Sequence, residues 1–337
     1  MYHLLQPLLF SLTPETSHDL SLDALGALNR LGLLSLVAPK VPAHPVELLG
    51  LSFPNQVGLA AGLDKNGDYI DALGALGFGH IEVGTVTPLP QPGNPLPRLF
   101  RLPDAQAIIN RMGFNNKGVE HMVANLKKRR FKGIVGVNIG KNAVTPVENA
   151  ADDYLICLRA VYPHADYITV NLSSPNTPGL RALQFGAMLD ALLQTLMAER
   201  ERLSQEHGKT VPVLVKIAPD MSDDDIRSVA ASLQQAGVDG AIATNTTIER
   251  PGVNGVEYAE EAGGLSGKPL AVAATHALSV LTRALAGSMP VIGVGGITDG
   301  DSARAKIDVG AALVQVYSGF IYRGPGLIKD IQEALNG

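Results

Sequence analysis

Eight short apolar runs recur along the chain, and longer stretches separate them. The runs are Val57–Ala60, His80–Gly84, Ile134–Ile139, Tyr167–Leu172, Val213–Ile217, Gly240–Thr244, Val291–Val294 and Leu313–Tyr317. Stretches between them, such as Asp223–Ala236, have the apolar spacing of amphipathic helices. Parallel strands buried on both faces have continuous apolar sequences and are joined by helices. Eight such units predict a closed (β/α)8 TIM barrel of the α/β class. An open doubly wound sheet is the alternative, but no GxGxxG motif opens a strand–helix unit near the start.

The first 36 residues have a different pattern, in which leucines and alanines recur at helical spacing. They form two sets, Leu4, Leu5, Leu8, Leu9 and Leu12, then Leu20, Ala24, Ala27, Leu28 and Leu31. Thr13-Pro14-Glu15 between the sets has the composition of a helix start. We therefore predict two short amphipathic helices, at about 2–11 and 14–34. Their apolar faces either pack on the main domain or lie on a bilayer surface.

Residues 37–55 contain Pro39, Pro42, Pro45 and Pro54, and we expect an extended linker there. The barrel then occupies residues 56–337. No apolar run approaches the roughly 18 residues that a membrane-spanning helix needs. The start has neither the basic region nor the cleavage site of a signal peptide.

Charge and cysteine content exclude several classes of function. The net charge is −5, and the short basic run at Lys127–Arg130 with Lys132 is typical of a solvated helix end, so nucleic-acid binding is not expected. Cys157 is the single cysteine, which excludes an internal disulfide and makes a cysteine-based metal site or iron–sulfur cluster implausible. We expect no metal, and we expect Cys157 to be buried in a helix.

Polar residues gather where the predicted strands end. They include Lys65, Thr85, Asn138, Asn171, Ser173, Ser174, Lys216, Thr244, Asn245 and Thr246. In TIM barrels the functional groups lie at the C-terminal ends of the strands and in the loops that follow. A strand end in a packed core has no reason to be this polar, so the pattern predicts a site rich in hydrogen-bond donors and acceptors.

The last two strand ends indicate a phosphate site. Gly295-Gly296 follows the seventh run, and Tyr317-Ser318-Gly319 closes the eighth. Loops after these two strands often bind phosphate through backbone N–H groups and a helix N-terminus. The phosphate could belong to a flavin mononucleotide or to a sugar-phosphate substrate.

Lys216 lies inside an apolar strand, and a buried cation needs a partner or a task. It could form a Schiff base as in an aldolase, or stabilise negative charge on a reduced flavin. Ser173 and Ser174 have no histidine within their segment, and the nearest is His164, so a hydrolase triad is poorly supported. A serine outside a triad can still relay a proton.

Six segments together resemble the signature sequences of the dihydroorotate dehydrogenases, in the order of that family. They are Ala60–Lys65, Gly84–Pro88, Asn110–Asn115, Asn171–Asn176, Thr244–Thr246 and Gly263–Gly267. The family's soluble forms have cysteine as the proton-abstracting residue, whereas the quinone-linked, membrane-associated class 2 forms have serine and an N-terminal helical extension. This chain has Ser174 and the extension, so it resembles the quinone-linked forms and favours the bilayer interpretation of its first two helices.

The resemblance implies oxidation of dihydroorotate to orotate with FMN and a quinone, in de novo pyrimidine (UMP) biosynthesis. Ser174 would take the proton from C5 of the substrate while hydride passes from C6 to flavin N5. The substrate site would comprise Lys65, Asn110, Arg111, Met112, Gly113, Phe114, Asn171, Asn176, Asn245 and Thr246. The FMN site would comprise Ala61, Gly62, Lys65, Thr85, Asn138, Asn171, Lys216, Thr244, Gly267, Gly296, Tyr317 and Ser318.

The same resemblance implies a peripheral membrane enzyme on the cytoplasmic face of the inner membrane. Quinone would enter between the first two helices along a route that includes His18, Arg101 and Tyr317. We further expect the loop Thr177–Ala182 after the serine to act as a lid, because of its position.

Other functions stay open as alternatives. A soluble form of the same enzyme would reduce fumarate or NAD, which conflicts with Ser174 and the extension. A phosphosugar aldolase would use Lys216 and be colourless. A membrane-bound flavin-binding protein without turnover would not need polar groups at so many strand ends.

Overall fold

The computed structural model describes residues 2–337 and confirms the predicted barrel. Its strands are β3 (Val57–Leu59), β4 (His80–Val86), β7 (Ile134–Ile139), β8 (Tyr167–Asn171), β9 (Val213–Ile217), β10 (Gly240–Ala243), β12 (Val291–Val294) and β13 (Leu313–Val316). They close in the order β10-β12-β13-β3-β4-β7-β8-β9, and every neighbouring pair is parallel. Nearly every strand residue is buried, because the helical layer covers the outer face and side chains fill the interior.

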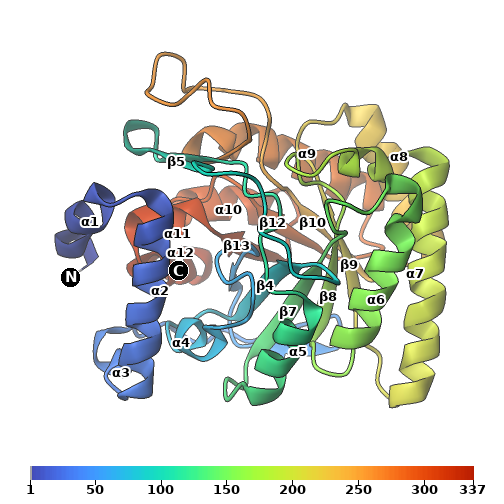
Figure 1. Ribbon diagram of the computed structural model, residues 1–337, viewed down its shortest axis with the longest axis horizontal. Coiled ribbons are helices and arrows are strands. Elements are labelled where there is room, and N and C mark those ends of the chain that lie inside the picture. The colour runs from blue at the N-terminus through green and yellow to red at the C-terminus, as the bar shows by residue number, and fades with distance from the viewer. Residues whose placement is uncertain (1) are drawn as a thin grey trace.

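Helices surround the barrel (Figure 1). They are α4 (Ile70–Gly74), α5 (Val119–Lys128), α6 (Ala150–Val161), α7 (Gly186–His207), α8 (Asp223–Ala236), α9 (Ala271–Leu285), α10 (Gly300–Asp308), α11 (Ser318–Arg323) and α12 (Gly326–Asn336), with 3-10 turns at Pro103–Ala105, Val147–Asn149, Leu180–Gln184 and Lys268–Leu270. Capping boxes start α8 and α10, where Ser222 and Asp299 accept backbone N–H groups. Cys157 is buried in α6, as expected.

The N-terminal segment forms α1 (Tyr2–Ser11), α2 (Pro14–Arg30) and the short α3 (Leu34–Val37); Met1 is outside the described residues. Thr13 caps α2, as its sequence predicted. The second helix ends before residue 34 because Gly32 has a φ of 71°, which ends the helical run. These helices lie along one flank of the barrel, with α1 beside α11 and α2 beside α4 (Figure 1). No helix within residues 2–337 has the length and apolar character that crossing a bilayer requires.

Residues 37–55 hold more structure than the expected linker. β1 (Val46–Leu48) and β2 (Leu51–Phe53) form an antiparallel hairpin. Phe53 is fully buried, and its ring lies 5.4 Å from that of His80 at the start of β4. The hairpin therefore closes the N-terminal end of the barrel.

A second small sheet covers part of the opposite end. β5 (Leu99–Leu102), β6 (Ala107–Asn110) and β11 (Gly264–Gly267) pair antiparallel in the order β11-β6-β5. Its strands come from the loops after β4 and after β10, and the sheet stands above the strand ends in Figure 1. Sequence patterns did not predict it, because its strands are short and β11 pairs with a strand far away in the chain, as Gly264 does with Asn110.

Candidate active site

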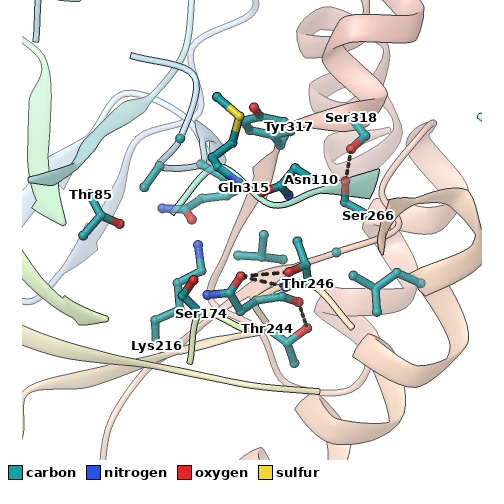
Figure 2. A pocket seen from close by; sticks show the side chains of 18 of the residues that line it. Thr85, Asn110, Ser174, Lys216, Thr244, Thr246, Ser266, Gln315, Tyr317 and Ser318 are labelled. Carbon is teal, nitrogen blue, oxygen red and sulfur yellow. Dashed lines mark hydrogen bonds between the residues drawn. The ribbon is translucent and has the colours of Figure 1, made fainter. Parts of the chain in front are cut away.

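One pocket opens at the C-terminal ends of the barrel strands, and side chains from different strands and loops converge on it (Figure 2). Most of the predicted site residues line it. They are Ala61, Gly62, Lys65, Thr85, Asn110, Met112, Gly113, Phe114, Asn171, Ser174, Asn176, Lys216, Thr244, Asn245, Thr246, Gly267, Gly296, Tyr317 and Ser318.

Two residues predicted for this site do not line the pocket. Arg111 turns outward: it donates to Glu261 at 2.6 Å, and its guanidinium lies 4.6 Å from the centre of the Phe100 ring. Asn138 is fully buried beneath the pocket and reaches it only through hydrogen bonds to Thr85 and Asn171. A side chain at a strand end can point into the pocket or away from it, and sequence spacing does not distinguish these two orientations.

Lys216 brings a buried positive charge to the pocket. It stands on β9, is 5% exposed, and burial lowers its pKa, while the negative charge of Glu82 acts in the opposite direction. Within the described residues no acidic side chain forms an ion pair with it. A desolvated ammonium of this kind suits an anionic partner.

Two glycines of the pocket wall lie so close to neighbouring backbone that no side chain would fit at either position. Gly296 has a φ of 76°, and a Cβ there would lie 2.4 Å from the backbone nitrogen of Ala271, the first residue of α9. Gly267 has a φ of 97°, and its Cβ would lie 2.2 Å from the Gln106 carbonyl. Ser318 donates to Ser266 at 2.8 Å beside them (Figure 2). Bare backbone, hydroxyls and a helix N-terminus together fit a phosphate group.

Ser174 occupies the other part of the pocket. It is 5% exposed, and its Oγ accepts the backbone N–H of Asn176 at 3.3 Å. The Asn176 side chain donates in turn to the backbone and side-chain oxygens of Asn110, at 3.1 and 3.2 Å. No histidine or carboxylate hydrogen-bonds to Ser174 within residues 2–337, so those residues do not form a hydrolase triad around it.

Lys65 is partly buried at the edge of the same pocket. Burial lowers its pKa to about 8, although Glu15 acts against this shift. At neutral pH the ammonium is therefore still charged and can bind a carboxylate.

Arg181 is a residue of the site's supporting structure that the sequence did not single out. It donates to the carbonyl of Ser173 at 3.1 Å, to the carbonyl of Thr246 at 3.0 Å and to the carboxylate of Asp220 at 2.8 Å. One guanidinium thus connects three loops, including the one expected to act as a lid. No local pattern separates such an arginine from an ordinary loop arginine.

A second cavity lies between α2 and the pocket. Lys65, Met112 and Tyr317 line both spaces, and His18 contributes from α2. Burial and the charge of Lys65 lower the pKa of His18 to about 3, so it is neutral at physiological pH. Arg101 does not line this cavity; it donates to the carbonyls of Leu9 and Phe10 at the end of α1, both at 3.2 Å.

Polar groups inside the strands extend the network below the pocket. Gln315 on β13 lines the pocket, and Glu82 on β4 is fully buried beneath it. Each interrupts an apolar run, which is the same signal that identified Lys216. The described residues include no group of three histidine, cysteine or acidic side chains placed to hold a metal.

Comparison with known proteins agrees with this geometry. The family model of dihydroorotate dehydrogenase matches residues 44–337. The chain is 65% identical over 328 residues to the dihydroorotate dehydrogenase (quinone) of Cellvibrio japonicus, covering 97% of this chain and 96% of that protein. It is 59% identical over 335 residues to the protein of the same name from Pseudomonas aeruginosa, with 99% and 98% covered.

Solved structures give the same relationship. The structure of DHODH from Eimeria tenella in complex with ferulenol has a TM-score of 0.87 and 38% identity, covering 96% of this chain and 90% of that one. The ligand-free form has a TM-score of 0.84 and 39% identity, with 94% and 93% covered. The chain therefore belongs to the dihydroorotate dehydrogenases, a family of flavin-dependent oxidoreductases.

Proposed function

We propose that this protein oxidises (S)-dihydroorotate to orotate and passes the electrons to a quinone, in de novo pyrimidine synthesis. The names of its relatives support the reaction and the acceptor. The observation that carries the proposal is the pairing, in one pocket, of the buried ammonium of Lys216 with the serine Ser174, which has no triad partner.

The flavin is FMN. Its phosphate would be held by Gly296, Gly267 and Ser318, which offer backbone N–H groups and a hydroxyl at the pocket wall. When bound, FMN supplies the hydride acceptor and the two-electron link to the quinone. Lys216 lines the same pocket, and its ammonium would stabilise negative charge on the bound flavin. Thr85, Thr244 and Tyr317 complete the walls.

Dihydroorotate occupies the part of the pocket next to Ser174. Lys65 binds the substrate carboxylate as a point charge. The side-chain amides of Asn110, Asn176 and Asn245 bind and orient the ring. Ser174 Oγ then takes the C5 proton. The substrate's acidic C–H bond and the absence of a hydrolase triad make a proton relay the role that fits this serine.

The quinone reaches the flavin edge through the cavity beside α2, past His18 and Tyr317. Arg101 holds the end of α1 and so supports the wall of this route. The exposed side chains Leu4, Leu5, Leu8, Leu20, Leu31 and Leu36 form the surface that meets the cytoplasmic face of the inner membrane. An apolar acceptor dissolved in the bilayer is then delivered directly to that cavity.

The decisive experiment is an anaerobic titration of the purified protein, observed at the flavin absorbance band. Dihydroorotate should bleach the band and a ubiquinone analogue should restore it. Recovery of the flavin band with fumarate or NAD alone would support dihydroorotate oxidation but overturn the quinone and membrane assignments. A colourless protein that takes up no FMN and is trapped with a phosphosugar by borohydride would support the aldolase instead.

Two further measurements test the quinone route. Replacing Arg101 by glutamine should raise the quinone KM more than the dihydroorotate KM, and equal effects on both would remove it from the route. Leu8→Glu should reduce sedimentation with anionic lipid vesicles while flavin reduction by dihydroorotate stays normal.

A further inference from the structure

Glu82 lies inside the barrel, below the pocket, and four side chains donate hydrogen bonds to it. It is 0% exposed on β4. Its Oε2 accepts from Gln315 Nε2 at 3.0 Å, Tyr167 OH at 3.1 Å and Thr169 Oγ1 at 3.2 Å, and its Oε1 accepts from Asn138 Nδ2 at 2.8 Å. A carboxylate in this position is expensive to bury, and the four donors offset that cost. Nothing in the catalytic proposal so far uses it.

A chain of hydrogen bonds leads from Oε1 of Glu82 up to the pocket. Because Asn138 donates its Nδ2 downward to Glu82, its Oδ1 faces upward and accepts from Thr85 Oγ1 at 2.5 Å and Asn171 Nδ2 at 3.2 Å. Asn171 Oδ1 then accepts from Asn245 Nδ2 at 3.3 Å. Asn245 Oδ1 accepts from the backbone N–H of Thr246 at 2.7 Å.

Every bond of this chain donates in the direction of Glu82. Asn171 and Asn245 are oriented by backbone N–H groups, because their Oδ1 atoms accept from Ser173 at 3.3 Å and from Thr246 at 2.7 Å. A carboxamide has a donor end and an acceptor end of nearly equal size, so Asn138, which bonds only to side chains, could otherwise lie in either orientation. An ionised carboxylate only accepts hydrogen bonds, and it therefore removes that freedom at the lower end of the chain. Through Asn138, Glu82 acts on Thr85 and Asn171, and both of these residues line the pocket.

We propose that Glu82 is a positioning residue of this enzyme: it fixes the donor–acceptor orientation of the Asn138 amide, and so positions the Thr85 hydroxyl and the Asn171 amide that the pocket presents to its ligands. This inference rests on the proposed function, because it concerns the same pocket. Glu82 does not line the pocket, and its hydrogen bond to Asn138 carries its effect on the amide orientation.

The test is Glu82→Gln, which keeps the size of the side chain but adds a donor where only acceptors stood. Asn138 can then turn over, and its amide N–H groups would face the donors of Thr85 and Asn171. Orotate affinity, measured from the shift of the flavin band, should fall by about tenfold or more, the loss expected for a hydrogen bond of ordinary strength. The infrared carbonyl bands of bound orotate should shift as well.

Thr169→Val is the matched control, since it removes one donor to Oε2 and leaves the Oε1 bond to Asn138 in place. It should lower stability without changing orotate affinity or the infrared bands. If Glu82→Gln does not fold, Glu82→Asp takes its place, because the shorter carboxylate withdraws from Asn138. It should then weaken orotate more than Thr169→Val does.

Two results overturn the inference in distinguishable ways. Wild-type protein that binds neither flavin nor orotate overturns the proposed function, and this inference with it. Wild-type protein that binds both, beside a Glu82→Gln variant that binds both equally well and shows unshifted carbonyl bands, overturns this inference alone. Equal effects of Glu82→Asp and Thr169→Val on orotate affinity do the same.

Discussion

At the N-terminal ends of the barrel strands, Phe53 packs against His80 and joins Tyr167 and Leu214 in one buried cluster. At the C-terminal ends, the strands present hydroxyls, amides and an ammonium to a pocket. The same eight strands thus carry an apolar plug at one end and a polar site at the other. Parallel strands all run in one direction, so the loops that follow them meet at one end of the barrel and the loops that precede them meet at the other. The residues that stabilise the barrel and the residues that line the pocket are therefore about one strand length apart.

An arginine–aspartate pair occurs at each end of the barrel, and the two pairs hold different parts of the structure. At the N-terminal end, both terminal nitrogens of Arg129 donate to Asp166 at 3.0 Å, and Asp166 also accepts the N–H of Val135 at the start of β7. At the C-terminal end, Arg181 binds Asp220 and two backbone carbonyls of the substrate loops. The Arg129–Asp166 pair stabilises the start of a barrel strand, whereas the Arg181–Asp220 pair holds the loops that line the pocket.

The largest effect is expected at the C-terminal end, from Ser174→Ala. Removal of the proton acceptor should slow flavin reduction by dihydroorotate by about 10²–10⁴-fold, as measured by anaerobic stopped flow. Orotate affinity and thermal stability should stay near wild type, because only one hydroxyl is lost. A slowing of less than about tenfold would mean that another group takes the proton.

The corresponding substitution at the N-terminal end of the barrel is Phe53→Ala, which should affect stability rather than catalysis. Loss of a fully buried aromatic ring should lower the free energy of unfolding by about 3–5 kcal/mol, as measured by urea denaturation. The rate per folded molecule should be unchanged. A fall in kcat at a temperature where the variant is fully folded would show that the two ends are coupled.

Comparing Arg181→Gln with Arg129→Gln tests whether an arginine–aspartate pair affects catalysis only when it lies at the pocket end of the barrel. Both arginines are partly buried partners of an aspartate, so both variants should lose stability, by about 1–3 kcal/mol. Only Arg181→Gln should lower kcat/KM for dihydroorotate, by roughly 10-fold or more. Equal kinetics for the two variants would show that Arg181 is a scaffold residue like its counterpart.

The smallest expected effect concerns Lys65 and pH. Its pKa is lowered to about 8, so the ammonium is present below that pH and is lost as pH rises through it. Binding an anion favours the charged form, and orotate affinity should therefore fall as pH rises above 8. Lys65→Met should bind orotate roughly tenfold more weakly at pH 7 and lose this pH dependence. A variant that keeps the wild-type profile would assign the titration to another group.

Local patterns predicted much of this architecture. The eight apolar runs became the eight strands to within a few residues, and the helix expected at Asp223–Ala236 has those bounds in the structure. Periodicity is a property of neighbouring residues, so sequence reports it directly. The β1–β2 hairpin and the β5-β6-β11 sheet were not predicted, because each of their short strands contains a polar residue and so lacks the continuous apolar run of the barrel strands.

For the site, the sequence itself determined which residues stand at the strand ends and that Lys216 is a cation inside an apolar strand. It also contained the signals of Glu82 and Gln315, which interrupt apolar strands in the same way. Only the tertiary structure decided that Arg111 turns away, that Asn138 acts from below, and that Arg181 joins three loops. The physical reason is that a side chain's type is local, whereas its hydrogen-bond partners come from strands and loops that meet only when the barrel closes.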